Sequence, residues 1–286
     1  MLASTLSLLR TATEAGYAIG AFNVYNLEAA RAVVAASEVN RSPAILQILP
    51  HALELGAAPL VKLCLAAAGD ASVPISVHLD HSRSSDDIKV ALSEGLSSIM
   101  ADGSHLNYSA NVAFTRAMAD IVHEHRGVIE GELGRLTGTE YALPVSEYEQ
   151  NLTDPDQASD FVAETGIDAL AVCIGNIHGR YPREPLLDFD RLAAIRSAVA
   201  VPLVLHGASG LSEPSVRRSI QLGISKFNVN TELRQAYLDA LRESLNSSPS
   251  ADLPDLMREA VTRMSQVVSA KLHLFGSVGK APEESN

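Results

Sequence analysis

Residues 202–232 read PLVLHGASGLSEPSVRRSIQLGISKFNVNTE, and this stretch contains one complete repeat of the pattern that decides the fold. A short apolar run at residues 203–205 ends in a histidine and a glycine-rich turn. A longer segment of helical period follows, and a second short apolar run comes at residues 226–229. Short apolar runs that alternate with helical segments are typical of βα units and of a parallel sheet.

The same alternation extends back to the beginning of the chain. Eight strands are predicted, each followed by helix-like sequence, at residues 18–23, 44–49, 75–79, 97–100, 128–132, 169–174, 203–205 and 226–229. Eight successive units favour a closed (β/α)8 barrel over an open doubly wound sheet, because the glycine-rich turn that the latter needs after an early strand is missing. We therefore expect an α/β fold with a single TIM-barrel domain over residues 1–286.

Two segments depart from the repeat. Residues 134–156 form a long connection after the fifth strand, and connections of this length often act as lids. Residues 252–271 predict an additional C-terminal helix that ends near Gly276.

Composition excludes several classes of partner. The formal net charge is −12, so neither nucleic acid nor an anionic membrane is expected to bind. The start of the chain has no leader pattern and no apolar run of membrane-spanning length is predicted, which indicates a cytoplasmic protein with a small soluble substrate. The two cysteines, Cys64 and Cys173, lie in apolar stretches and predict buried thiols.

Polar residues gather where the predicted strands end, which is the face where barrel enzymes place their active sites. Three histidines, His81, His178 and His206, follow three different strands. Three imidazoles with an open fourth position can hold a catalytic zinc ion. A single histidine at a strand end is as often a hydrogen-bonding residue, but three of them with Asp80 nearby favour a metal site.

The loops after the last two predicted strands indicate a phosphate site, which barrel enzymes often build there. Residues 207–210 would expose backbone N–H donors, and Asn230 and Thr231 stand where a helix begins. For either loop alone, a tight turn or a helix cap is an equally good interpretation.

With these residues in place, the sequence over residues 17–280 resembles the class II, zinc-dependent fructose-bisphosphate and tagatose-bisphosphate aldolases. The resembling segments occur in the same order, and together they are specific although each alone is weak. They are FN at 22–23, HLDH at 78–81, DGS at 102–104, ELG at 132–134, TDP at 153–155, HG at 178–179, LHGASG at 205–210 and NVNT at 228–231.

The resemblance implies a role for each matched residue. The catalytic Zn²⁺ would be held by His81, His178 and His206, and Asp80 would donate and accept the substrate proton. The resemblance places a second or displaced metal at Asp102 and Glu132. It implies that dihydroxyacetone phosphate is bound by Gly179, Gly207, Ser209, Asn228, Asn230 and Thr231, and that Asn23 contacts the substrate.

Two further roles follow from the same resemblance. Gly179 and Gly207 match positions that help to bind a monovalent cation, Na⁺ or K⁺. Glu140, on the connection after the fifth strand, is the nearest match to a second catalytic acid or base, although its surroundings are less acidic than in the family.

The implied reaction is the reversible cleavage of fructose- or tagatose-1,6-bisphosphate to dihydroxyacetone phosphate and glyceraldehyde 3-phosphate, by a homodimer or homotetramer. Two departures leave another ketose 1-phosphate open, with an aldehyde product that carries no phosphate. Leu49 stands near a position where many relatives have a serine, and Asn176 stands where they have Thr or Ala. Arg258 could supply a positive group for a second phosphate, but a solvated surface arginine is the simpler interpretation.

Three other classes of protein would require different residues. A Schiff-base aldolase would need a lysine from a central strand, and the one candidate, Lys226, is predicted at the wrong end of the barrel. An amidohydrolase barrel would need His-x-His after the first strand, where Phe22-Asn23-Val24 stands. A non-catalytic barrel subunit should have lost a histidine ligand or Asp80, and this chain keeps them all.

Overall fold

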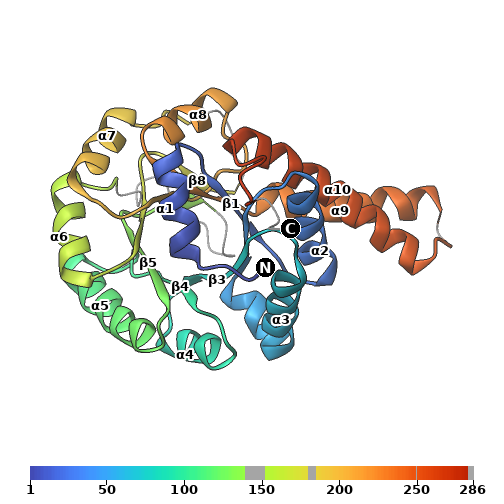
Figure 1. Cartoon of the computed structure of the whole chain (residues 1–286), viewed down its shortest axis with the longest axis horizontal. Helices are drawn as coiled ribbons and strands as arrows, with labels where there is room; N and C mark the ends of the chain where they lie inside the picture. The colour runs from blue at the N-terminus through green and yellow to red at the C-terminus, as the bar shows by residue number, and fades with distance from the viewer. Residues whose placement is uncertain (139–151, 180–184, 249, 283–286) are drawn as a thin grey trace.

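The computed structural model describes residues 1–138, 152–179, 185–248 and 250–282. Eight parallel strands form a closed barrel in the order β1-β10-β9-β7-β5-β4-β3-β2 (Figure 1). The barrel strands are β1 (Ile19–Asn23), β2 (Ala44–Ile48), β3 (Ile75–Ser82), β4 (Ser98–Ala101), β5 (Val128–Leu133), β7 (Ala169–Val172), β9 (Leu203–Leu205) and β10 (Ile224–Val229). The predicted (β/α)8 barrel is confirmed. Two short strands lie outside it and pair with each other, β6 (Thr137–Gly138) and β8 (Ile177–His178).

Helices form a ring outside the strands (Figure 1). They are α2 (Leu27–Val39), α3 (Pro50–Asp70), α4 (Ser85–Ser93), α5 (Tyr108–Glu124), α6 (Pro155–Thr165), α7 (Phe189–Ala198), α8 (Glu213–Gln221) and α9 (Thr231–Ser247). Most begin at a polar residue whose side chain accepts a hydrogen bond from the first turn, as Asn26 does for α2 and Asp154 for α6. Such caps fix where each helix begins, and therefore how much chain remains for the βα loop before it.

The N-terminal helix α1 (Thr5–Ala15) closes one end of the barrel. Its Leu9 and Ala12 are fully buried and pack in a cluster with interior residues of the strands, among them Ile19, Ile45 and Val204. This apolar floor leaves the opposite end, where the strands run out into the βα loops, for polar side chains.

The predicted C-terminal helix is α10 (Leu253–Phe275), which begins after Asp252 and ends at Gly276. Gly276 adopts the left-handed conformation (φ 71°) that commonly terminates a helix. α10 packs against α2, α9 and β1, and its Phe275 ring stacks on Phe227 with ring centroids 4.9 Å apart. In Figure 1 the ends of α9 and α10 extend away from the barrel.

Helix α3 contradicts one expectation. It is long and apolar enough, by length and composition, to cross a membrane, whereas no run of that kind was predicted. However, its backbone breaks at Ala57 (φ 45°, ψ −149°), it contains Pro59, and it packs against β2 and β3 beside α2 and α4. Its apolar residues therefore belong to the packing of the helix ring on the barrel.

Candidate active site

The end of β3 supplies two adjacent side chains to the mouth of the barrel. Neighbouring residues of a strand normally face opposite sides of the sheet. His81 has φ 49°, a left-handed conformation that costs a non-glycine residue about 1–2 kcal/mol. This break in the alternation lets the side chains of both Asp80 and His81 lie buried among the other polar residues of the mouth.

The carboxylate of Asp80 is held by amide groups from three other strands. Asn23 Nδ2 donates to Oδ2 at 2.9 Å, and Asn228 Nδ2 donates to Oδ1 at 3.1 Å. Gln47, which was not predicted as a site residue, also donates to Oδ2 at 3.4 Å. Asp80 is thus a buried, oriented carboxylate, and two of its three partners were predicted site residues.

His81 and His206 face each other across the mouth. Nε2 of His81 lies 2.7 Å from Nδ1 of His206, and the rings are nearly perpendicular at an interplanar angle of 87°. The outer nitrogens meet carboxylates, because His81 Nδ1 lies 3.1 Å from Asp102 and His206 Nε2 lies 2.9 Å from Glu130. Histidines that bind metals characteristically direct one nitrogen inward and the other to a carboxylate.

Carboxylates complete two sets of potential ligands. Ligand atoms of Asp80, His81 and His206 lie within 4.8 Å of one another, and so do those of His81, Asp102 and Glu132. Oε2 of Glu132 is buried and has no hydrogen-bond partner among the described residues, although it lies 3.6 Å from His81 Nδ1. A buried carboxylate oxygen without a donor is costly, so these residues fit a bound cation.

The electrostatics of the site also favour a cation. Burial opposes the charging of His81, but the carboxylates of Asp80 and Asp102 raise its pKa to about 10. Burial, together with the negative charge of Asp102, raises the pKa of Glu132 well above its usual range. Burial and the positive charge of His81 lower the pKa of His206. In the metal-free protein, protons therefore balance the carboxylates, and a divalent ion would replace those protons.

The glycine of the predicted DGS segment at 102–104 allows a close contact with α5. A Cβ atom at Gly103 would lie 2.2 Å from Oδ1 of Asn111, and Asn111 in turn donates to the backbone carbonyl of Glu132. Asp102 itself accepts from the backbone and hydroxyl of Ser104. The close approach of α5 to this loop thus fixes both carboxylates of the second ligand set.

The predicted phosphate residues come together from the loops after β9 and β10. Ser209 Oγ accepts from the backbone N–H of Glu232 at the start of α9, and Asn230 Oδ1 accepts from Tyr25 at 2.9 Å. Two of the N–H groups expected to face a phosphate donate within the protein instead, from Ala208 to Asn228 and from Gly210 to Glu232. Thr231 is the first residue of α9, as the sequence analysis expected.

Three predicted residues are placed only in part or not at all. His178 lies in β8, where its backbone is paired with Gly138, but its side chain is outside the described part of the structure. Gly179 is buried and has φ 92°. Glu140 lies outside the described residues, so the second acid or base stays a prediction.

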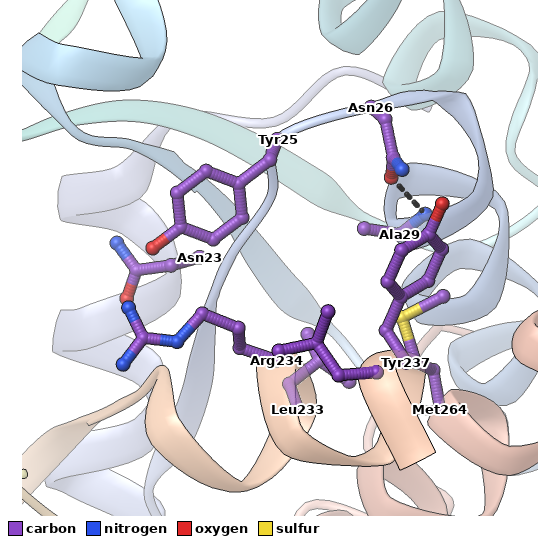
Figure 2. Close-up of a pocket in the computed structure, with 9 residues that line it drawn as sticks. Asn23, Tyr25, Asn26, Ala29, Leu233, Arg234, Tyr237 and Met264 are labelled. Atoms are coloured by element: carbon purple, nitrogen blue, oxygen red, sulfur yellow. Dashed lines mark hydrogen bonds between the residues drawn. The ribbon is translucent and has the colours of Figure 1, made fainter. Parts of the chain in front are cut away.

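A small cavity of about 170 Å³ adjoins the mouth at Asn23 and extends to α9 (Figure 2). In this view the side chain of Arg234, from the first turns of α9, reaches towards Asn23 and Tyr25. Arg234 was not predicted, because a single arginine at the start of a helix carries no distinctive sequence signal. It places a cation next to a predicted substrate contact.

The three residues that were considered for specificity have other surroundings. Leu49 is fully buried, and Asn176 donates to the backbone carbonyl of His206 at 3.1 Å. Asn176 thus braces the chain beside a predicted ligand. Arg258 is exposed, pairs with Asp255, and lines a different groove between α2 and α10.

A second polar layer lies deeper in the barrel than the predicted site. Lys226 is fully buried within β10 and not at its end, so the predicted position was wrong because β10 begins at Ile224. Its Nζ donates to Oε2 of Glu130 at 2.7 Å and lies 3.5 Å from His78 Nε2. The ion pair with Glu130 accounts for this lysine without a Schiff base.

Known proteins resemble this chain in sequence and in fold. Residues 3–280 match the sequence profile of the family described as fructose-bisphosphate aldolase class-II. The YdjI aldolase from Escherichia coli K12 is 37% identical, with a TM-score of 0.89 over 99% of this chain and 100% of that one. A protein from Coccidioides immitis, provisionally assigned as a fructose-1,6-bisphosphate aldolase, is 36% identical, with a TM-score of 0.91 over 96% of this chain and 97% of that one.

A more distant structure shares the fold. The fructose-bisphosphate aldolase from Campylobacter jejuni is 20% identical, with a TM-score of 0.82 over 98% of this chain and 97% of that one. The profile match covers nearly the whole chain. The chain therefore belongs to the class II fructose-bisphosphate aldolase family.

Proposed function

We propose that the protein is a zinc-dependent aldolase that reversibly cleaves a ketose 1,6-bisphosphate, fructose- or tagatose-1,6-bisphosphate, to dihydroxyacetone phosphate and glyceraldehyde 3-phosphate. The observation that carries this proposal is the arrangement of Asp80 beside the facing nitrogens of His81 and His206. It joins an oriented carboxylate to a candidate metal site within one buried cluster.

The zinc ligands in this proposal are His81, His206 and His178, with Asp102 and Glu132 as ligands for a second or displaced ion. Imidazole nitrogens around an open position suit zinc chemistry. When bound, zinc would act as a Lewis acid toward the negative charge that carbon–carbon cleavage leaves on the substrate. A homodimer or homotetramer and an accessory Na⁺ or K⁺ at Gly179 and Gly207 belong to the same proposal.

Asp80 performs the proton transfer at the C4 hydroxyl. Its two oxygens accept from Asn23 and Asn228, so the carboxylate cannot rotate freely. It takes the C4 hydroxyl proton during cleavage and returns it to the aldehyde oxygen during condensation. Asn228 and Asn23 thereby act on the substrate both directly and through Asp80.

The phosphate of dihydroxyacetone phosphate is assigned to Gly179, Gly207, Ser209, Asn230 and Thr231. The N-terminus of α9 contributes its positive end to this region, which suits an anion in a protein of net charge −12. The backbone N–H groups of Ala208 and Gly210 already have partners inside the protein. Side-chain donors therefore carry more of the proposed phosphate contact than was expected.

The aldehyde half decides between the bisphosphate and the alternative, a ketose 1-phosphate that yields an aldehyde without phosphate. Arg234 beside Asn23 favours a second phosphate, because it brings a cation to the cavity that adjoins the mouth. Leu49 favours the alternative, because a buried leucine replaces a hydroxyl donor at the end of β2. Arg258 supports neither, since it lines another groove.

The test is the release of dihydroxyacetone phosphate from fructose 1,6-bisphosphate, tagatose 1,6-bisphosphate and a panel of ketose 1-phosphates, with and without a chelator. Release that stops with chelator and returns with Zn²⁺ supports the metal mechanism. Arg234→Met should reduce kcat/KM for a bisphosphate far more than for a 1-phosphate. No release from any ketose phosphate by zinc-loaded protein would refute the aldolase assignment and leave the non-catalytic subunit as the better explanation.

A further inference from the structure

Two polar layers are stacked inside the barrel, and each member of the deeper one precedes a residue of the active site by two positions. Lys226 precedes Asn228 on β10, Glu130 precedes Glu132 on β5, and His78 precedes Asp80 on β3. Residues two apart on a strand face the same side, so these side chains share the barrel interior. All three residues of the deeper layer are at least 98% buried.

Glu130 connects the two layers. One of its oxygens, Oε2, accepts from Lys226 Nζ at 2.7 Å, and the other, Oε1, lies 2.9 Å from Nε2 of His206. With one oxygen held on each side, the carboxylate group has a fixed plane. An ionised carboxylate only accepts hydrogen bonds, so Nε2 of His206 carries the hydrogen and Nδ1 keeps its lone pair.

The nitrogen left with the lone pair is the one that faces His81, 2.7 Å from its Nε2. We propose that Lys226 is a positioning residue for the metal site: by anchoring Glu130, it fixes both the ring orientation of His206 and the nitrogen that His206 offers to the ion. The inference rests on the proposed function, because it takes His206 to be a metal ligand. Outer partners of this kind typically change metal affinity by about 10–100-fold when they are removed.

A plain structural ion pair is the competing explanation. A buried Lys–Glu pair that only holds the barrel together would lower stability when broken, but it would leave the metal affinity unchanged. Metal affinity and ligand geometry therefore separate the two explanations, whereas activity alone does not.

The experiment compares Lys226→Met with Val204→Ala in the full-length protein. Methionine keeps most of the length of lysine without its charge. Val204 is the register neighbour of Lys226 on β9 and packs in the apolar floor, so its truncation disturbs the same interior away from Glu130. Co²⁺ affinity is measured by competition with a chelator, and the ligand field is read from the visible absorption of bound Co²⁺.

We expect Lys226→Met to weaken Co²⁺ binding by about 10–100-fold and to change the absorption spectrum, while Val204→Ala matches the wild type in both. Wild-type affinity and an unchanged spectrum in Lys226→Met would overturn the inference alone. Failure of the wild-type protein to bind Co²⁺ would instead overturn the metal site, and the inference with it.

A second variant keeps the test decisive where Lys226→Met does not fold. The double variant Lys226→Met with Glu130→Gln removes both charges and leaves no uncompensated ion in the barrel. It is expected to bind Co²⁺ at least about tenfold more weakly than the wild type. Affinity equal to that of the wild type would show that the pair does not position His206.

Discussion

Glu130 and Glu132 lie two residues apart on β5 and face the same barrel interior, yet their surroundings are opposite in charge. Burial opposes the ionisation of Glu130, but Lys226 and the bonded His206 lower its pKa below the usual range. Burial and the charge of Asp102 raise the pKa of Glu132 instead. The deeper carboxylate is neutralised by the ammonium group of Lys226 at 2.7 Å, whereas the outer one lies beside a second carboxylate and holds its proton more readily.

This difference distinguishes a structural layer of polar residues from the layer that forms the candidate active site. The deeper layer has its own cation and can stay rigid in the absence of a ligand. Among the side chains that the structure describes, the outer layer has two histidines and three carboxylates, the latter being Asp80, Asp102 and Glu132. Arg83 pairs with Asp102, and in the metal-free protein protons on His81 and Glu132 balance further charge. A site built in this way gains most from a divalent ion, because binding releases the protons and satisfies the orphaned oxygen of Glu132.

The largest expected effect is a loss of kcat when a catalytic group of the outer layer is replaced and the deeper layer is left unchanged. Asp80→Asn keeps the size of the side chain but removes the proton acceptor, so kcat should fall by about 10²–10⁴-fold. Metal content should stay at the wild-type level. Steady-state cleavage of the preferred ketose phosphate and metal analysis of the purified variant measure the two quantities.

Asp190→Asn is the matched control, because Asp190 is exposed in the first turn of α7. It should leave kcat within a factor of two of the wild type, a range that about 0.4 kcal/mol spans. A kcat for Asp80→Asn that lies within this same range would remove Asp80 from the mechanism.

The next prediction compares the effects of replacing Glu130 and Glu132 on stability. Glu130→Gln leaves the buried Lys226 without its counter-ion and should lower the free energy of unfolding by about 3–5 kcal/mol. Glu132→Gln removes a carboxyl group whose pKa is already raised well above its usual range, so it should change stability by less than about 1 kcal/mol or raise it. Urea unfolding of both variants, with a chelator present, measures the difference.

In the presence of zinc, Glu132 should also contribute to stability. Glu132→Gln should lose part of the stabilisation that zinc gives the wild type, since the variant lacks one candidate ligand. Equal destabilisation by the two substitutions in chelator would contradict the distinction between the layers.

The sequence predicted the outer layer far better than the deeper one, for a physical reason. Residues such as Asp80, His81 and His206 follow the ends of apolar runs, where a polar group signals a site on the βα face. Glu130 was predicted at the end of the fifth strand and Lys226 at the beginning of the eighth, and nothing in the sequence indicates that the two are partners. Only the closed barrel shows that their side chains meet, and that Lys226 is buried although it was predicted at the strand's beginning.

The fold was predictable because eight apolar runs at βα spacing have few other solutions. The extra helix α10 was also predicted, from its apolar period and its terminating Gly276. The closing helix α1 was not predicted, since one short amphipathic helix before the first strand does not indicate what it covers. Gln47 and Arg234 were missed because neither belongs to a motif at a strand end.

A third prediction concerns the pH dependence of the metal-free protein. The pKa of His81 is raised to about 10, so its contribution to stability is complete below its ordinary pKa near 6.5 and is lost as pH rises through 10. The raised pKa of Glu132 acts in the same direction. Stability in chelator should therefore fall between pH 7 and 10, by at most about 1.4 kcal/mol per pH unit for each proton released.

Urea midpoints at several pH values measure this slope, and Zn²⁺ affinity should rise over the same range because the ion competes with the protons. Glu132→Gln should show a shallower slope than the wild type. A flat profile in chelator would mean that the outer layer is not balanced by protons.

The smallest expected effect lies in the deeper layer, away from Glu130. Ser98 Oγ lies 2.7 Å from Nδ1 of the buried His78, whose Nε2 faces the ammonium group of Lys226. Burial and Lys226 lower the pKa of His78, so the ring is neutral and its Nδ1–H donates to Ser98. Ser98→Ala removes this acceptor and should lower the free energy of unfolding by about 1–3 kcal/mol.

The same substitution should leave kcat and Co²⁺ affinity unchanged, because Ser98 touches the metal site only through His78 and Lys226. Ser197→Ala is the matched control: its hydroxyl donates to a helix carbonyl on the exposed face of α7, and its loss should cost less than about 0.5 kcal/mol. If Ser98→Ala weakened Co²⁺ binding as strongly as Lys226→Met, the whole deeper layer would act on the metal. Positioning would then be a property of the network and not of the Lys226–Glu130 pair.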